Sequence, residues 1–126
     1  MREIININRN DAVRVILDDL SKDKVVVLSG GFGSGKTTLL GKIASNLELS
    51  VNHVSEIDDP LGVGYGKLPS GDSILLDEVS SNMPQKIRSL EASYDRAVVA
   101  THYFNIGEAY AEYLTGKKSV VYHLRS

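Results

Sequence analysis

Residues 25–40 read VVVLSGGFGSGKTTLL. The stretch opens on an apolar, mostly β-branched run, Val25–Leu28, which predicts a strand buried on both faces, as in parallel sheets. A glycine-rich turn follows, and from Leu39 to Leu47 the apolar residues have helical spacing. A buried strand joined to a helix by a short turn is the repeating unit of an α/β domain with a parallel sheet.

Strands and helices alternate along the rest of the chain. We expect further strands at 51–57, 73–76, 97–100 and 119–124. Helices are expected at about 10–21, 84–94 and 106–114. Asn10 or Asp11 would cap the first of these helices. The pattern predicts a single domain, 1–126, with an α/β fold of three layers (αβα) around a five-stranded, mainly parallel sheet.

The segment 58–72 interrupts this alternation. Its prolines and glycines, among them Pro60, Gly62, Gly64 and Pro69, break any helical or strand period. A loop of about fifteen residues is long for a compact domain, and such loops are usually functional.

The composition excludes several classes of protein. The chain has 126 residues, no cysteine and a formal net charge of -2. Without cysteine there is no disulfide, thiolate zinc site, iron–sulfur cluster or cysteine nucleophile. The small negative charge gives no overall attraction to nucleic acid. No run approaches the roughly 18 apolar residues of a membrane span, and the N-terminus lacks a signal or transit pattern, so we expect a soluble, cytoplasmic protein.

The glycine-rich turn carries a recognisable motif. Residues 30–37 satisfy G-x-x-x-x-G-K-[ST], the Walker A pattern, between a predicted strand and a predicted helix. Glycines allow successive backbone N–H groups to turn inward around a β-phosphate, at the positive end of the helix that follows. Lys36 can bridge β- and γ-phosphate oxygens, and the Thr37 hydroxyl can coordinate Mg²⁺. The alternative is a glycine-rich turn with an exposed lysine.

With this motif the chain resembles the P-loop NTPases. The resemblance implies ATP and Mg²⁺ as cofactors. The residues that it places at the nucleotide are Gly30, Gly31, Phe32, Gly33, Ser34, Gly35, Lys36, Thr37 and Thr38. Phe32 stands at a variable position of the motif, and Thr38 lies on the helix side of it.

A second acidic motif follows about forty residues after the P-loop lysine. The run Ser73–Leu76 leads into Asp77 and Glu78, which resembles a Walker B motif. In that family the aspartate supports Mg²⁺, and an adjacent glutamate, the mark of the additional-strand catalytic glutamate division, activates the attacking water. Any strand can also end in solvated acids, so the pair gains meaning only beside the Walker A motif.

A polar pair ends the next predicted strand. The resemblance implies that Thr101 or His102, after Arg96–Ala100, senses the γ-phosphate or positions the water. A histidine bonded to a neighbouring loop is the alternative for His102. His53 and His123 lie within other predicted strands and are interpreted as structural. No ABC signature sequence occurs, which disfavours an ABC transporter subunit.

The resemblance covers nearly the whole chain. With the five predicted strands numbered in order along the chain, it implies a sheet order of 5-1-4-3-2. It indicates a minimal Mg²⁺-dependent ATPase that acts as a nucleotide-driven switch or motor component. A small-molecule or nucleotide kinase is an alternative, although the 58–72 loop has Lys67 and no arginine for a lid. A nucleotide-responsive binding or assembly module with negligible turnover is another. Preference for ATP over GTP rests on the resemblance alone.

Partners are weakly indicated by the sequence. Members of this division often complete their site across an oligomer interface, so a homo-oligomer or a larger protein assembly is expected. Arg88, Arg96 and Arg125 are candidate arginine fingers, although each is better interpreted as an ordinary surface residue. Nucleic acid is not favoured by the net charge, and no membrane span is expected.

Overall fold

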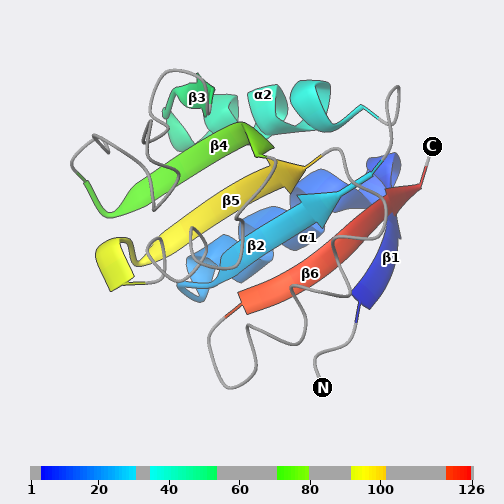
Figure 1. The fold of residues 1–126 in the computed structure, drawn as a ribbon, viewed down its shortest axis with the longest axis horizontal. Coiled ribbons are helices and arrows are strands. Elements are labelled where there is room, and N and C mark those ends of the chain that lie inside the picture. Colours follow the sequence, from blue (N-terminus) through cyan, green and yellow to red (C-terminus); the bar gives the residue numbers. More distant parts are fainter. Residues whose placement is uncertain (1–3, 31–34, 54–70, 80–91, 102–118, 126) are drawn as a thin grey trace.

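The computed structural model describes residues 4–30, 35–53, 71–79, 92–101 and 119–125. These residues form the helices α1 (Arg9–Ser21) and α2 (Lys36–Leu47) and one parallel sheet (Figure 1). Its strands are β1 (Ile4–Asn8), β2 (Val25–Ser29), β3 (Val51–His53), β4 (Ser73–Val79), β5 (Arg96–Thr101) and β6 (Ser119–Arg125).

The sheet has six strands in the order β1-β6-β2-β5-β4-β3, so the predicted count of five is wrong. The additional strand is β1, which lies outside β6 with Ile4 opposite Val121 and Asn8 opposite Arg125. Its sequence, IININ, contains asparagines that disfavour strands, but Ile7 is buried against the core while Asn6 and Asn8 are exposed. Pairing with β6 and burial on one side outweigh the weak local preference. The strands β6-β2-β5-β4-β3 lie at the five predicted strand segments and are neighbours in the expected sequence, but β3 covers only residues 51–53 of the segment predicted at 51–57, and β1 extends the sheet beyond the expected five strands.

Helix α1 begins one residue earlier than expected, and its cap is Asn8 rather than Asn10 or Asp11. Asn8 has extended backbone angles as the last residue of β1, and its side-chain oxygen accepts a 3.0 Å hydrogen bond from the Asp11 N–H. The chain therefore passes from strand to helix without a connecting loop, because one asparagine ends the first element and caps the second.

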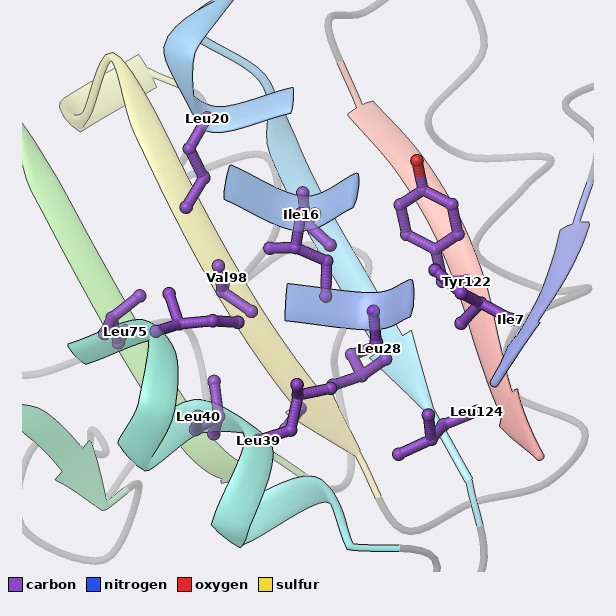
Figure 2. Packing of buried hydrophobic residues seen from close by; sticks show 14 of the residues in the cluster. Ile7, Ile16, Leu20, Leu28, Leu39, Leu40, Leu75, Val98, Tyr122 and Leu124 are labelled. Atoms are coloured by element: carbon purple, nitrogen blue, oxygen red, sulfur yellow. The ribbon is translucent and has the colours of Figure 1, made fainter. Parts of the chain in front are cut away.

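A single apolar cluster fills the space between the helices and the sheet. Both helices contribute to it, so α1 and α2 cover the same face of the sheet (Figures 1 and 2). Ile16 and Leu20 of α1 and Leu40 of α2 are fully buried there, against Leu28 and Val98 of the central strands. Full burial of a leucine or isoleucine side chain contributes about 1.5–3 kcal/mol.

The other face of the sheet is buried as well. Val25, Val27, Val99 and Val121 have no exposed surface. This agrees with the interpretation of the valine run as a strand covered on both sides. The helices predicted at 84–94 and 106–114, which would supply the third layer, lie outside the described residues apart from the buried Tyr94 and its two predecessors.

A buried polar contact fixes α1 on the sheet. Asp19, near the end of α1, is 6% exposed and accepts a hydrogen bond from the Tyr122 hydroxyl of β6, with the Lys24 ammonium 3.7 Å from its other oxygen. Burial, followed by the hydrogen bond and the charge of Asp19, raises the pKa of Tyr122 well above its ordinary value. Because α1 begins directly after the last residue of the parallel strand β1, its N-terminus lies beside the carboxyl ends of the strands.

Two predictions can be checked only in part. The strand expected at 51–57 is present as β3, Val51–His53, and residues 54–57 lie outside the described part of the chain, as do residues 58–70 of the predicted loop.

Neither α1 nor α2, the helices of the described residues, is long and apolar enough to cross a membrane.

Candidate functional site

The carboxyl ends of the parallel strands meet at one edge of the sheet, and the residues singled out in the sequence lie there. Ser29, the last residue of β2, is opposite Thr101 of β5 on one side and opposite His123 of β6 on the other. Asp77 lies near the end of β4, and α2 begins at the same edge. This is the edge at which open α/β sheets bind ligands.

The turn between β2 and α2 is described at both of its ends. Gly30 is buried, and Gly35 is the N-cap of α2 with φ 93° and ψ 18°, the left-handed region that favours glycine. Gly35 itself has no side chain that could cap this helix end. A helix N-terminus presents backbone N–H groups and a partial positive charge, which suit an anion. Gly31, Phe32, Gly33 and Ser34 lie outside the described residues.

Lys36 is buried, with 4% of its surface exposed, so the alternative of a turn with an exposed lysine does not hold. Its ammonium group donates a hydrogen bond to the Gly30 carbonyl at the other end of the turn. Burial lowers the pKa of Lys36, and the charge of Asp77 opposes that shift. A buried cation beside a helix N-terminus is costly unless anionic groups compensate it, as Asp77 does in part and as a bound anion would do further.

The glycine-rich motif and the acidic motif of the sequence analysis are in direct contact. The Thr37 hydroxyl of α2 donates a 2.9 Å hydrogen bond to Oδ2 of Asp77 on β4, although the two residues are 40 positions apart in sequence. Asp77 is 1% exposed and Thr37 is exposed. A hydroxyl that donates to a carboxylate keeps its lone pairs, so the same oxygen can also serve as a metal ligand.

This donor set fits Mg²⁺ better than a metal held by protein alone. Among the described residues, no group of three or more histidine, cysteine, aspartate or glutamate side chains could hold a metal ion. Mg²⁺ commonly takes one or two protein oxygens and completes its shell with phosphate oxygens and water. The Thr37 hydroxyl and the Asp77 carboxylate are such oxygens, so a metal here would depend on a bound phosphate ligand.

Of the other residues predicted to act in catalysis, Glu78 and Thr101 are placed through their backbone alone. Glu78 lies in β4 between Leu76 and Val79, where the pairing with β5 shifts its register. Thr101 is the last residue of β5, opposite both Ser29 and Val79. Register shifts of this kind redirect side chains and are frequent beside active sites. The described part of the structure does not include the side chains of Glu78 and Thr101 or any part of His102. Thr38, which was assigned to nucleotide binding, is exposed in the first turn of α2.

Two residues at this edge have no counterpart in the sequence predictions. The Ser29 hydroxyl lies 3.3 Å from the Tyr122 carbonyl and 3.2 Å from Nδ1 of His123. The only sequence signal for Ser29 is that it directly precedes Gly30. Arg9 lies against Gly35, because a Cβ added to Gly35 would be 2.9 Å from Arg9 Cδ. No local pattern connects these two positions.

Of the three arginine-finger candidates, the structure places Arg96 with its side chain and Arg125 through its backbone. Arg96 begins β5, at the sheet edge opposite the site, and its Nε donates a 2.6 Å hydrogen bond to the Ser73 hydroxyl. This placement favours a structural function for Arg96. Arg125 ends β6, and Arg88 lies outside the described residues, as does Lys67 of the predicted loop.

No model of a known protein family matches the chain, and no curated protein matches it. The resemblance to P-loop NTPases therefore rests on the two motifs themselves and on their contact at the sheet edge.

Proposed function

We propose that the chain binds Mg²⁺ together with a nucleoside triphosphate, ATP in the first instance, and hydrolyses it to the diphosphate and phosphate. The observation that carries the proposal is the 2.9 Å hydrogen bond between the Thr37 hydroxyl and the Asp77 carboxylate. It joins the end of the glycine-rich turn to the acidic strand end, and these are the parts that a metal–triphosphate site requires.

The phosphates would bind where the turn meets α2. The backbone N–H groups after Gly35 and the ammonium of Lys36 are the hydrogen-bonding and cationic groups at this place. Lys36 now donates to the Gly30 carbonyl, a neutral acceptor. Phosphate oxygens are anionic and accept stronger hydrogen bonds from an ammonium group, so a bound triphosphate would compete well for this lysine.

Thr37 and Asp77 would hold the metal. The Thr37 oxygen has lone pairs for Mg²⁺ while it donates its proton to Asp77, so the hydrogen bond orients the hydroxyl for that purpose. When bound, Mg²⁺ would supply charge neutralisation at the β- and γ-phosphate oxygens.

Hydrolysis requires a group that accepts a proton from the attacking water. Glu78 is the proposed base, because it follows Asp77 directly and lies at the register shift of β4. The water oxygen forms the new bond to the γ-phosphorus while the bond to the β–γ bridging oxygen breaks, which releases ADP and phosphate. Thr101, at the end of the neighbouring strand β5, or His102, which follows it, would orient the water or the γ-phosphate.

The test combines nucleotide binding with phosphate release at fixed Mg²⁺. Lys36→Ala should abolish binding, whereas Lys42→Ala, which removes an exposed lysine from the same helix, should change nothing. Glu78→Gln should bind ATP normally and release phosphate about 100-fold to 10,000-fold more slowly. Wild-type protein that fails to bind Mg²⁺–ATP would refute the proposal, and unchanged phosphate release by Glu78→Gln would refute the assignment of the base.

A further inference from the structure

An arginine from another part of the chain lies against the glycine-rich turn. Arg9 is the first residue of α1 and follows the last residue of β1, at the carboxyl edge of the sheet. A Cβ built on Gly35 would lie 2.9 Å from Arg9 Cδ and 3.2 Å from its guanidinium nitrogen Nη1. The guanidinium of Arg9 therefore lies beside the N-cap of α2, the residue that precedes Lys36.

The electrostatic setting of Arg9 is unfavourable without an anion. A cation in the first turn of a helix faces the positive end of its own helix dipole, and the start of α2 is a second positive end. Lys36, which follows Gly35, adds a third positive group, whose charge Asp77 offsets in part. Within the described residues Arg9 forms no ion pair, and Asp11, the acid of the same helical turn, lies 3.7 Å from Arg14.

We propose that Arg9 is a phosphate-binding residue of the nucleotide site, whose guanidinium bonds the oxygens of the diphosphate that ATP and ADP share. The inference rests on the proposed function. A guanidinium presents a planar set of donors that match two phosphate oxygens, and it stays charged under all ordinary conditions. In the proposed function Lys36 and Thr37 bind the γ-phosphate end of the triphosphate and the metal. Arg9 approaches Gly35 from the start of α1, and we assign it to the diphosphate part.

This arrangement predicts a conflict between folding and binding. Removal of the positive charge at position 9 relieves the repulsion at the two helix ends, so the free protein should melt at the same temperature or slightly higher. The same change should weaken every ligand that carries a diphosphate. A residue with a merely structural function would show the opposite melting behaviour.

The experiment measures dissociation constants of Mg²⁺–ATP, ADP and inorganic tripolyphosphate for wild-type protein and for Arg9→Gln. Loss of one charge-assisted hydrogen bond should raise all three constants about ten- to a hundredfold. The ratio should shrink in high salt, because Arg9 is exposed and its attraction is screened. Arg9→Lys should fall between the two. Arg14→Gln is the matched control, since it removes an exposed arginine from the same helix and should leave all constants unchanged.

Each outcome decides for or against Arg9. If wild-type protein binds the three ligands and Arg9→Gln binds them equally well, Arg9 is not a phosphate-binding residue and the proposed function stands. If Arg9→Gln weakens ATP and ADP but not tripolyphosphate, the guanidinium contacts the base or sugar, and the proposal is wrong. If wild-type protein binds none of them, the proposed function and the proposal built on it both fail.

Discussion

Replacing Gly35 with alanine should destabilise the protein, and the structure allows the cost to be estimated. Gly35 has φ 93°, where a residue with a Cβ is strained by about 1–2 kcal/mol. The new Cβ would also lie 2.9 Å from Arg9 Cδ. This second term should be small, because the Arg9 side chain is flexible and exposed and can turn aside. We expect a total loss of about 1–2 kcal/mol, or a melting temperature about 4–10 °C lower.

Urea unfolding of four variants separates the two terms. Gly35→Ala measures their sum, and Arg9→Ala combined with Gly35→Ala removes the crowding while it keeps the backbone strain. The double variant should therefore regain little of the lost stability relative to Arg9→Ala alone. The fourth variant, Gly41→Ala, lies in the same helix with no atom within 4 Å of the added Cβ and should be stabilising by up to about 1 kcal/mol. If Gly35→Ala were as stabilising as Gly41→Ala, the left-handed start of α2 would be wrong.

Three further predictions concern the helix cap, the metal ligand and the alkaline limit of stability. Asn8→Ala removes the cap of α1 and should cost about 1 kcal/mol in urea unfolding, whereas Asn8→Asp should retain most of it. Thr37→Val should remove the Mg²⁺-dependent part of ATP affinity in a titration with and without the metal, and Thr37→Ser should keep it; equal loss in both would count against a metal ligand. The pKa of Tyr122 is raised from 10.0 in the folded state. Its contribution to the free energy of unfolding is therefore complete below about pH 10 and is lost as the pH rises above that value, where this tyrosine ionises in the unfolded chain. Tyr122→Phe should flatten the resulting decline in melting temperature at alkaline pH.

The elements that the sequence predicts are those with strong local patterns. The valine run of β2 and the spaced leucines of α2 are both buried as expected, because their burial follows from side-chain order along a few residues. Strand β1 has no such pattern. Its asparagines disfavour a strand, and its stability comes from β6, at the far end of the chain. Asn8 was therefore missed as the cap as well, since the end of an unpredicted strand could not be located.

In the candidate site, too, the contact between two local motifs could be predicted, whereas contacts that depend on the arrangement of distant elements could not. Contact between Thr37 and Asp77 follows from two motifs and the rule that parallel strands end at one edge, so it could be predicted. Ser29 with His123 and Arg9 with Gly35 depend on which strands and helices are neighbours. That information is distributed over the whole chain, and no short motif carries it.

The strand order has a consequence for how the chain acquires its structure. Strands β1, β2 and β3 all lie before residue 54, yet none of them pairs with another of the three. Strands β1 and β2 both pair with β6, and β3 pairs with β4. During synthesis, the first part of the chain can form its helices but no sheet ladder of its own, and β1 lacks its partner until residues 119–125 have left the ribosome. The central valine strand β2 thus stays apolar and unpaired until β5, residues 96–101, has been made, and this interval is when aggregation or chaperone binding would compete with folding.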